Sequence, residues 1–263
     1  MNVTIIIPTL NACEHTDACL RSLHQTYKCR FRFVVFDNGS TDETAKVLEK
    51  YPLVASYRST WNMGFAAGCN AAVRLETTRR ATGPFRNGIN PDVFVFLNND
   101  TILFPGWLDE LLAPFEDPEV GAVGPMSNWV SGEQLIPAGP WRAAEGEDED
   151  LAAGAEVWMH DWKGGVTETK RLVGFCMAVR ASAFREVGGF DEQFEIGGCE
   201  DDDLCKSLTK AGYKLMIARG CFVYHVGHVT FNENGIDYMS QEFINQQKFA
   251  AKWGGEFAGP MQP

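Results

Sequence analysis

The chain alternates short, continuous apolar runs with longer segments whose apolar residues recur at helical spacing. In its first part, predominantly apolar runs lie at 3–8, 31–36, 53–57 and 93–97. The run 93–97 lacks the alternation of a half-exposed strand and therefore predicts a strand buried on both faces, and 3–8 predicts a first buried strand. The runs 31–36 and 53–57 predict a second apolar strand and a short third strand. Segments with helical spacing lie between the four runs, at 13–26, 42–50 and 62–76. Strands that alternate with helices favour right-handed crossovers and hence a parallel sheet.

The second part of the chain continues this pattern less regularly. We expect helices at 106–115, 182–187, 200–211 and 239–253, and strands at 120–123, 172–179, 214–218 and 221–224. The segment 127–165 differs in composition, and its acidic run at 145–150 predicts a solvated loop. The same segment contains Trp129, Trp141, Trp158 and Trp162. Core packing and ligand contact both remain open for these tryptophans.

A polar cluster ends the apolar run 93–97. Asn98, Asn99 and Asp100 follow it directly. Ligands of open α/β sheets bind beyond the carboxyl ends of the strands, so Asp100 lies where a metal ion or a phosphate-bearing ligand is expected. Alternatively, the cluster turns the chain and caps the helix that begins near Pro105. The run by itself leaves both interpretations open.

A second pair of carboxylates, Asp37 and Asp42, follows another predicted strand, the run 31–36. The carboxyl ends of parallel strands meet at one edge of a sheet. We therefore expect this pair at the same edge as Asp100.

Four consecutive carboxylates, Glu200 to Asp203, open a predicted helix. Acidic residues complement the dipole at a helix N-terminus, but two would suffice and four in a row repel one another. Glu200 and Asp203 have the i,i+3 spacing of one helix face, with Asp201 and Asp202 pointing elsewhere. Gly197–Gly198, directly upstream, permits a loop that closes over a substrate.

Two histidines, His225 and His228, follow the predicted strand 221–224. Either can be an ordinary core or surface residue, or a partner for a divalent ion already held by one carboxylate. An ion with one carboxylate and one histidine as ligands keeps other positions open for a nucleotide diphosphate.

The charge of the chain limits its partners. Lys and Arg number 23 against 35 Asp and Glu, which gives a formal net charge of −12 and a pI of about 4.9. Such a balance argues against non-specific binding to nucleic acid or to anionic membrane surfaces. An acidic protein that handles a phosphorylated ligand needs a cation as intermediary, which favours a bound metal.

The eight cysteines are scattered, and none forms a C-x-x-C pair. A reducing compartment therefore fits better than a disulfide framework, and structural zinc is not expected. The sequence shows neither the pattern of a signal peptide nor an apolar stretch of transmembrane length. We expect a cytoplasmic protein, either free or peripheral at the inner face of the membrane.

Five motifs, taken in this order, resemble the family 2 glycosyltransferases with the GT-A fold. They are Pro8-Thr9, Asp37-Asn38-Gly39-Ser40-x-Asp42, Asn98-x-Asp100, Gly188-Gly189-Phe190-Asp191-Glu192, and Glu200-Asp201 with Asp203-Leu204. The resemblance extends from Ile5 to the region of His225. It implies an α/β fold with a single Rossmann-like, mostly parallel sheet flanked by helices and an acceptor-side insertion. It also implies one GT-A domain over 1–263, with a nucleotide-binding half at about 1–101 and an acceptor-binding half at about 102–263.

The activity implied by this resemblance is an inverting, metal-dependent sugar transfer from a nucleotide diphosphate sugar (a dTDP- or UDP-sugar) to an acceptor hydroxyl. The acceptor would be a glycan or a lipid-linked or protein-linked glycoconjugate. Asp201 matches the general base, and Glu200 beside it would orient donor or acceptor groups. Asp100 and His225 match the ligands of a Mn²⁺ or Mg²⁺ ion that bridges the diphosphate.

The resemblance also implies where the substrates bind. The donor pocket is expected at Pro8, Thr9, Asn11, Asp37, Asn38, Gly68, Asn98 and Asn99. Within it, Asp37 would hydrogen-bond the nucleobase. Further substrate contacts are expected at Gly198, Asp202 and Trp129, and the segment 127–165 is the candidate for acceptor selection.

The sequence departs from the family pattern in two places. Asn98 replaces the first carboxylate of the family's D-x-D motif, which makes the metal site depend on His225. Gly68-Cys69-Asn70 stands where many relatives have Ala-Arg-Asn, so an arginine contact to the donor is absent. The pattern over 62–70 is instead similar to members described as rhamnosyltransferases, and it points to that branch.

Two other classes of protein compete with a glycosyltransferase. A catalytically silent protein of the same fold would bind a sugar nucleotide or glycan, although Asp100, Asp201 and His225 are all present. A nucleotidyltransferase would have a glycine-rich, basic loop after its first strand. The segment 8–12 contains neither glycine nor lysine, which speaks against this class.

Overall fold

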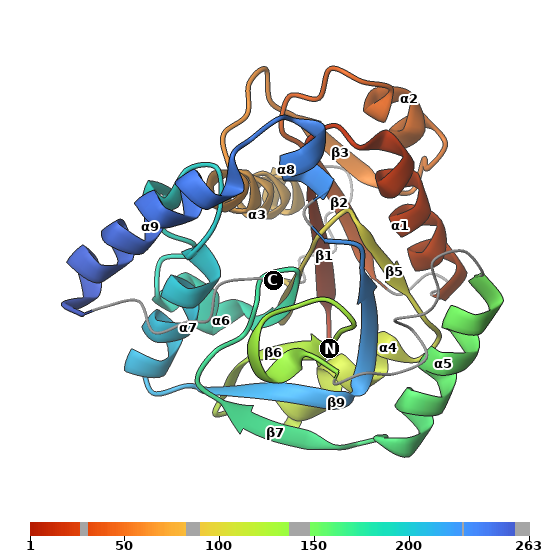
Figure 1. The fold of residues 1–263 in the computed structure, drawn as a ribbon, viewed down its shortest axis with the longest axis vertical. Coiled ribbons are helices and arrows are strands. Elements are labelled where there is room, and N and C mark those ends of the chain that lie inside the picture. Colours follow the sequence, from red (N-terminus) through yellow and green to blue (C-terminus); the bar gives the residue numbers. More distant parts are fainter. Residues whose placement is uncertain (27–30, 83–89, 137–147, 228, 256–263) are drawn as a thin grey trace.

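One mixed β-sheet with helices on both faces organises the chain (Figure 1). The computed structural model describes residues 1–26, 31–82, 90–136, 148–227 and 229–255. Within these residues the sheet has nine strands in the order β3-β2-β1-β4-β8-β6-β9-β5, with β7 paired to β9. The strands are β1 Val3–Thr9, β2 Arg32–Asp37, β3 Ala55–Arg58, β4 Val93–Leu97, β5 Thr101–Leu103, β6 Val120–Met126, β7 Val166–Thr169, β8 Cys176–Arg180 and β9 Lys214–His225.

The helices lie mostly where the sequence predicts them. They are α1 Cys13–Thr26, α2 Thr44–Glu49, α3 Phe65–Thr82, α4 Trp107–Leu112, α5 Asp148–Asp161, α6 Ala181–Glu186, α7 Glu200–Lys210, α8 Val229–Glu233 and α9 Tyr238–Trp253. Short 3₁₀ turns occur at Ala113–Glu116, Gly132–Gln134 and Glu192–Phe194. None of the helices in the described ranges combines the length and apolar character needed to cross a bilayer.

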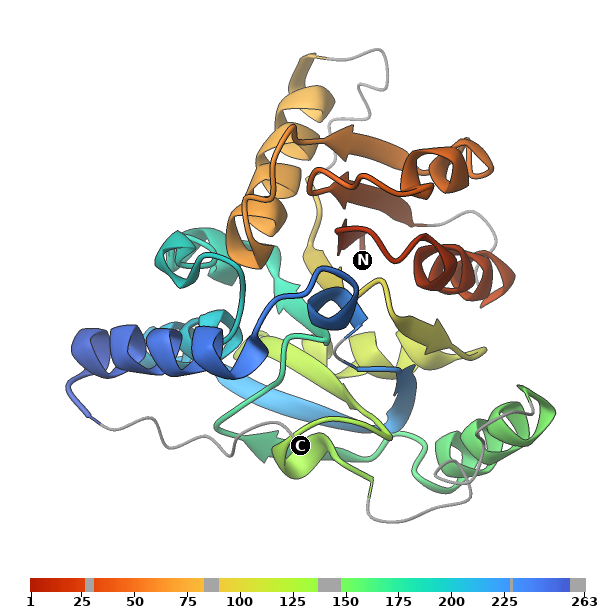
Figure 2. The same ribbon diagram turned by 45° about the horizontal axis from the view of Figure 1, so that its top comes forward.

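The first half of the sheet is parallel, as the alternating pattern predicts. β1 pairs in parallel with β2 and β4, and β2 pairs in parallel with β3. α1 covers one face of these strands and α3 covers the other (Figure 2). Ile5 and Ile7 therefore pack in the same core cluster as Leu20 of α1, whereas Ile6 packs in the cluster that contains Cys69 of α3. Burial of β1 and β4 on both faces, predicted from their apolar runs, is confirmed, whereas β3 at the edge of the sheet alternates between half-buried and exposed residues.

The second half of the sheet departs from the predicted parallel arrangement. β8 runs antiparallel to β4 and β6, while β9 is parallel to β6 and antiparallel to β5 and β7. The strand expected at 172–179 begins only at Cys176. Its earlier backbone N–H groups bond to side chains instead, since Val173 donates to Gln134 and Gly174 donates to Asp201.

The strands expected at 214–218 and 221–224 form one strand, β9. Its register against β6 shifts between Pro125, opposite Ala218, and Met126, opposite Phe222. Beyond this irregularity β9 pairs with β5, which is too short to give a sequence signal, and Thr101 comes to lie opposite His225. The residues that follow β4 are thereby joined to the end of β9.

The solvated loop predicted for the acidic run 145–150 is not found over its described part. Helix α5 begins at Asp148, inside the acidic run, and the rest of that run and Trp141 lie outside the described residues. Trp158 donates its indole N–H to the carbonyl of Arg219 at 2.8 Å. Trp162 stacks on Trp158, and the Arg219 guanidinium lies 4.2 Å from the centroid of the Trp162 ring. These two tryptophans thus pack α5 against β9.

Candidate active site

A cavity opens beyond the carboxyl ends of β1 and β4. The described residues of its lining include 8–10, 98–100, 173–175 and 196–202, together with Asn38, Arg171, His225 and Glu242. These segments come from strand ends, from the loops before β8 and α7, from the first turn of α7 and from α9. The cavity therefore lies at the sheet edge where the sequence predicts a ligand site.

Asp100 and His225 face each other in this cavity. The pairing of Thr101 with His225 and a hydrogen bond from Val226 N to the Asp100 carbonyl bring the two residues together. His225 Nε2 lies 3.3 Å from Asp100 Oδ1, and both side chains are buried. His225 Nδ1 lies 3.0 Å from the Trp129 carbonyl oxygen. Since a carbonyl only accepts, Nδ1 carries a proton and Nε2 is directed at the carboxylate.

This pair suits a divalent cation. Within the described chain, neither Asp100 Oδ1 nor His225 Nε2 has a hydrogen-bond partner. Burial, the largest single influence, raises the pKa of Asp100, but the interactions with His225, a backbone hydrogen bond and the more distant His15 together outweigh it, and the pKa is lowered. A carboxylate that stays ionised beside an imidazole nitrogen is a usual ligand pair. Over the described ranges, no group of three or more His, Cys, Asp or Glu side chains could hold a metal. Any ion here would therefore need ligands from a substrate or water.

The residues predicted for the donor pocket divide into lining and support. Pro8, Thr9, Asn98 and Asn99 line the cavity. Asn99 Nδ2 donates to Thr9 Oγ1 at 3.1 Å and to the hydroxyl of Thr16 at 3.0 Å. These bonds connect the end of β4 to β1 and α1, so Asn99 also fixes the position of Asp100.

Asn38 lines the cavity, and Gly68 supports it from behind. Asn38 Nδ2 donates to the Gly64 carbonyl and its Oδ1 accepts from Met63 N, both at 2.9 Å. A Cβ on Gly68 would lie 3.2 Å from Asn38 Nδ2 and 3.3 Å from the Phe36 ring. Gly68 therefore permits close packing of α3 on β2 and is not part of the described lining.

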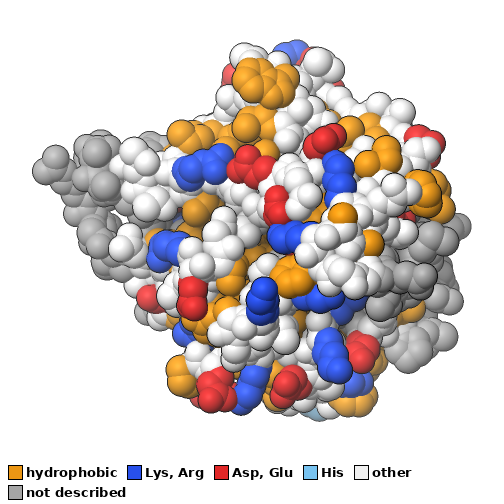
Figure 3. All heavy atoms as spheres, turned by 90° about the vertical axis from the view of Figure 1, so that its left-hand side faces the viewer, with side chains coloured by type: hydrophobic (Ala, Val, Ile, Leu, Met, Phe, Trp, Pro, Cys, Tyr) orange, Lys and Arg blue, Asp and Glu red, His pale blue; other side chains and the backbone are white. Residues whose placement is uncertain are grey.

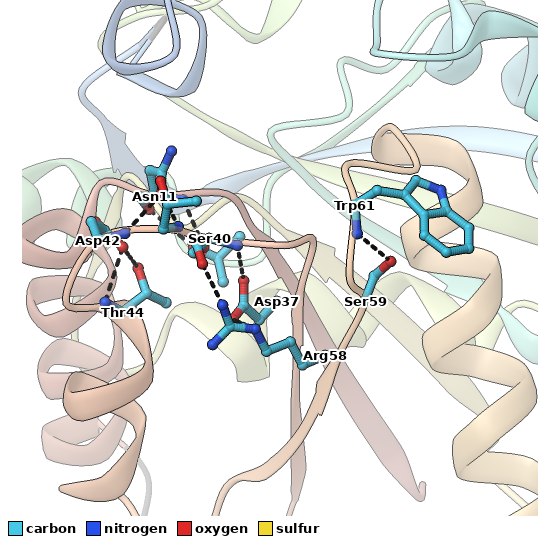
Figure 4. Close-up of polar contacts among 10 residues, drawn as sticks. Asn11, Asp37, Ser40, Asp42, Thr44, Arg58, Ser59 and Trp61 are labelled. Atoms are coloured by element: carbon cyan, nitrogen blue, oxygen red, sulfur yellow. Dashed lines mark hydrogen bonds and ion pairs between the residues drawn. The ribbon is translucent and has the colours of Figure 1, made fainter.

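Asp37 and Asn11 lie outside the lining as well. Both take part in a group of polar contacts around the turn after β2 (Figure 4). Asp37 Oδ1 accepts from Ser40 N at 2.8 Å, and its Oδ2 pairs with Arg58 Nε at 3.4 Å. Asn11 Oδ1 accepts from Thr41 N at 2.7 Å, and Asn11 N donates to Ser40 Oγ at 2.8 Å. Both side chains shape the turn after β2, and the nucleobase contact expected of Asp37 would have to compete with two existing partners.

The four carboxylates at the start of α7 are all buried but have different partners. Glu200, Asp201 and Asp202 line the cavity, whereas Asp203 accepts from Lys252 and Trp253 of α9. The i,i+3 spacing therefore does not place Glu200 and Asp203 in one environment, and Asp201 and Asp202 line the cavity together with Glu200. The cavity meets the end of the helix rather than its side, so consecutive residues of the first turn surround it.

The carboxylate groups of Asp201 and Asp202 are held by hydrogen bonds or ion pairs, whereas one oxygen of Glu200 is left without a partner among the described residues. Asp201 Oδ2 accepts from Gly174 N at 2.7 Å, and its Oδ1 accepts from Asp202 N at 2.8 Å. Asp202 pairs with Arg171 Nε at 2.5 Å. Glu200 Oε2 lacks a partner in the described structure.

Burial and mutual repulsion raise the pKa of two of these carboxylates. Burial, together with the charge of Asp201, raises the pKa of Glu200 to about 8. Burial and Asp201 also raise the pKa of Asp202 to about 7, against the opposing charge of Arg171. Perturbed carboxylates in a cleft are typical of functional sites.

Comparison with known proteins identifies the family. The sequence model "Glycosyl transferase family 2" matches residues 4–188, more than half of the chain, and the model "N-terminal domain of galactosyltransferase" matches residues 161–230. The chain belongs to glycosyl transferase family 2. The resemblance to this family and to its rhamnosyltransferase-like branch is confirmed.

Curated relatives of this family 2 member are similar over most of its length. An N-acetylglucosaminyl-diphospho-decaprenol L-rhamnosyltransferase of Mycobacterium tuberculosis is 27% identical over 86% of this chain and 76% of its own. The O-antigen biosynthesis protein RfbC of Myxococcus xanthus is 28% identical over 81% of this chain. The chain spans 16% of that protein, which is therefore much longer.

Solved structures confirm the GT-A fold. The mannosyltransferase PcManGT from Pyrobaculum calidifontis, in complex with GDP-Man and Mn²⁺, has a TM-score of 0.61 at 18% identity. It covers 98% of this chain and 66% of its own. GalNAc-T7 with UDP, GalNAc and Mn²⁺ has a TM-score of 0.62 at 14% identity and covers 85% of this chain and 43% of its own. Both likenesses concern the fold alone.

In this family 2 protein, Trp129 supports the site from outside the described lining. Its carbonyl holds His225 Nδ1, and its ring packs edge-on against the imidazole with centroids 5.5 Å apart. Phe175 stacks on His225 at 4.9 Å. Gly198, expected to contact substrate, does line the cavity with φ +98°. His228, the alternative histidine, lies outside the described residues.

Sequence reasoning missed two charged residues of the lining. Arg171 precedes an apolar run, and its pairing with Asp202 depends on a contact distant in sequence. Glu242 lies in α9, where the polar side of an amphipathic helix is normally exposed to water. No sequence signal distinguishes either residue from a surface charge.

The raised pKa of Glu200 predicts a dependence of stability on pH. Its pKa rises from 4.5 to about 8 on folding, so the folded protein binds this proton more tightly than the unfolded chain. The stabilisation is complete below the unfolded value and is lost as the pH rises through the folded value. We expect Glu200→Gln to melt several degrees above the wild type at about pH 9, and close to it at about pH 5.

Thermal melts of the ligand-free protein in the presence of a chelator test this expectation. The exposed Glu156→Gln on α5 is the matched control and should follow the wild type at every pH. Parallel curves for Glu200→Gln and the wild type would show that Glu200 is ionised at little cost in the folded protein.

Proposed function

We propose that this protein is a metal-assisted, inverting glycosyltransferase that moves a sugar from a nucleotide diphosphate sugar to an acceptor hydroxyl. The observation that carries the proposal is the unpartnered Asp100–His225 pair, which shares one cavity with the carboxylates of α7. A diphosphate in a cavity with this many carboxylates needs a cation, and the pair offers two ligand atoms for one.

In this proposal Asp100 and His225 hold a Mn²⁺ or Mg²⁺ ion. When bound, such an ion neutralises the charge that develops on the leaving diphosphate. Asn98 adds no carboxylate, so the protein supplies few ligands and leaves positions for diphosphate oxygens and water. The Trp129 carbonyl holds Nδ1 of His225 and thereby directs Nε2, on the other side of the ring, toward the ion. This arrangement is common around metal-bound histidines.

The general base is proposed to be Asp201, as the family motif implies. Two backbone N–H groups orient its carboxylate, and each oxygen keeps a further lone pair with which to take the acceptor proton. Glu200 is the alternative base, because its Oε2 is unpartnered in the described chain and its pKa is raised to about 8. As the base takes the acceptor proton, the acceptor oxygen would form its bond to the anomeric carbon on the face opposite the diphosphate, while the bond from that carbon to the diphosphate breaks, and this would give inversion.

The donor is proposed to be a dTDP- or UDP-sugar. Pro8, Thr9, Asn38, Asn98 and Asn99 would contact its nucleotide part directly. Asn11, Asp37 and Gly68 would act by shaping the nucleotide-binding part of the cavity. The family resemblance also implies a direct contact between Asp37 and the nucleobase. The chain pattern over 62–70 and the rhamnosyltransferase named above support a rhamnosyl donor.

The acceptor is proposed to be a glycan or a lipid-linked or protein-linked glycoconjugate. The named relatives in O-antigen biosynthesis and on a decaprenol-linked sugar support this choice. We place nucleotide binding in about 1–101 and acceptor binding in about 102–263 of one domain. The protein would work in the cytoplasm, including at the inner face of the membrane.

Release of nucleoside diphosphate tests the proposed function. We expect release when the protein and Mn²⁺ are incubated with one member of a panel of UDP-, dTDP- and GDP-sugars, and its loss with a chelator. Pyrophosphate release would indicate a nucleotidyltransferase instead. Tight donor binding without any release, with a range of glycan acceptors, would favour the catalytically silent protein.

A further inference from the structure

The helix α9 forms part of the cavity wall although it lies beyond both matched family segments. Asn245 Nδ2 donates to the carbonyls of Phe194 and Gly197, both at 2.9 Å. Lys252 and Trp253 each donate to Asp203 at 2.8 Å. On this face of the molecule Lys, Arg, Asp and Glu side chains are interspersed with hydrophobic ones (Figure 3). α9 is therefore bound along its length to the loop before α7 and to α7 itself.

Glu242 points inward from α9, while its apolar neighbours point outward. Glu242 is only 6% exposed, whereas Phe243 is 61% and Ile244 is 48% exposed. Glu242 lines the cavity. A surface helix normally buries its apolar residues and exposes its carboxylates. Amphipathicity alone does not explain this orientation.

Within the described residues, Glu242 forms no ion pair with a Lys, Arg or His side chain. Its Oε2 is buried and, in the described part of the chain, without a hydrogen-bond partner. The ammonium group of Lys248 is bonded to the Gln193 carbonyl and to Glu195. Arg171 is paired with Asp202. A buried carboxylate oxygen that lacks a donor is costly, and a ligand that offers an O–H group would remove that cost.

The surroundings of Glu242 favour the donor side of the cavity. The loop before α7 contacts both α9 and the start of α3. Asn245 of α9 donates to the Gly197 carbonyl, and Phe65 N of α3 donates to the Ile196 carbonyl at 3.3 Å. A Cβ on Gly198 would lie 3.9 Å from the Cα of Glu242. None of the described residues 127–136, the start of the proposed acceptor segment, lines the cavity.

We propose that Glu242 accepts a hydrogen bond from a hydroxyl of the donor sugar and selects donors that carry a hydroxyl at that position. The inference rests on the proposed function and adds a specificity residue from α9. A carboxylate acceptor discriminates between a sugar hydroxyl and its absence because the deoxy sugar leaves the buried charge unpaired.

The test compares binding of nucleotide sugars with binding of the bare nucleotides. Titration calorimetry with Mn²⁺ would use UDP, dTDP and GDP beside UDP-glucose, UDP-N-acetylglucosamine, dTDP-rhamnose and GDP-mannose. For the nucleotide sugar that the wild type binds best, we expect Glu242→Ala to weaken binding about 10-fold or more. Glu242→Gln keeps one acceptor atom and should weaken binding of the nucleotide sugar less than Glu242→Ala does. Affinity for the bare nucleotide should stay within about two-fold in both variants, and Glu156→Ala should match the wild type.

The outcomes separate the two levels of the proposal. Wild-type protein that binds no nucleotide sugar would overturn the proposed function and this inference with it. Variants that bind the sugar nucleotide as the wild type does would overturn the inference alone. A melting temperature of ligand-free Glu242→Ala at or above that of the wild type would support it, since the unpaired carboxylate is gone. If the variants bind the bare nucleotide and the nucleotide sugar more weakly by the same factor, Glu242 has a structural role and the inference is overturned.

Discussion

Asp201→Asn is expected to lower sugar transfer by about 10²- to 10⁴-fold, the usual contribution of a general base. Binding of the nucleotide sugar should stay within about two-fold, because donor contacts are proposed on other residues. The physical reason is that the amide cannot take the acceptor proton. Steady-state rates of nucleoside diphosphate release and calorimetric donor affinity, measured on the same preparation, check both parts.

The variant also changes two structural hydrogen bonds, so its controls matter. An Asn side chain can accept from only one of Gly174 N and Asp202 N, and its NH₂ group would oppose the other. A thermal melt must therefore show that the variant is folded at the assay temperature. The exposed Asp109→Asn on α4 is the matched control and should retain full activity.

Glu200→Gln decides between the two candidate bases. If Asp201 is the base, Glu200→Gln should retain measurable sugar transfer. Its transfer rate should differ from that of the wild type on the alkaline side of the pH profile. Loss of transfer in Glu200→Gln with transfer preserved in Asp201→Asn would assign the base to Glu200. Loss of donor binding in Asp201→Asn would make Asp201 a ligand or structural residue.

Asp100→Asn is expected to weaken Mn²⁺ binding in the presence of nucleoside diphosphate by more than the roughly 10- to 100-fold typical of an outer-shell partner. The amide lacks the charge that the ion requires, and Asp100 faces His225 without another partner in the described chain. Electron paramagnetic resonance of Mn²⁺, titrated into protein with UDP or dTDP, measures this affinity without reference to turnover. His225→Ala should show a loss in the same direction.

Chelation gives an independent check on the same site. Wild-type transfer should disappear with EDTA and return with Mn²⁺ or Mg²⁺, while Asp109→Asn should bind Mn²⁺ as the wild type does. Unchanged Mn²⁺ affinity in both Asp100→Asn and His225→Ala would refute the proposed metal site. Activity that persists in EDTA would point to metal-independent transfer.

Much of the first half could be predicted from the sequence. The unbroken apolar runs predict buried strands, because only residues enclosed on both faces of a sheet are apolar without alternation. Helical segments between them require crossovers and hence parallel pairing, which the structure has in β1 to β4. Asp100 was correctly expected at the cavity because polar residues after a parallel strand lie at its carboxyl end.

Local pattern was less informative about side-chain direction. The i,i+3 rule placed Glu200 with Asp203, yet Asp201 and Asp202 line the cavity. The rule describes the side of a helix, and this site is at its end. Asp37 likewise lies at the end of β2, at the expected edge of the sheet, but its carboxylate already accepts from Ser40 N and pairs with Arg58.

What the sequence by itself determined is the family, the parallel half of the sheet and the strand end at which Asp100 lies. Only the tertiary structure decided which residues complete the site. The irregularity in β9 and its antiparallel pairing with β5 bring His225 to Asp100. The hydrogen bonds of Asn245 turn α9 so that Glu242 enters the same cavity. The reason is physical: an apolar pattern reports that a face is buried, but not which distant segment covers it.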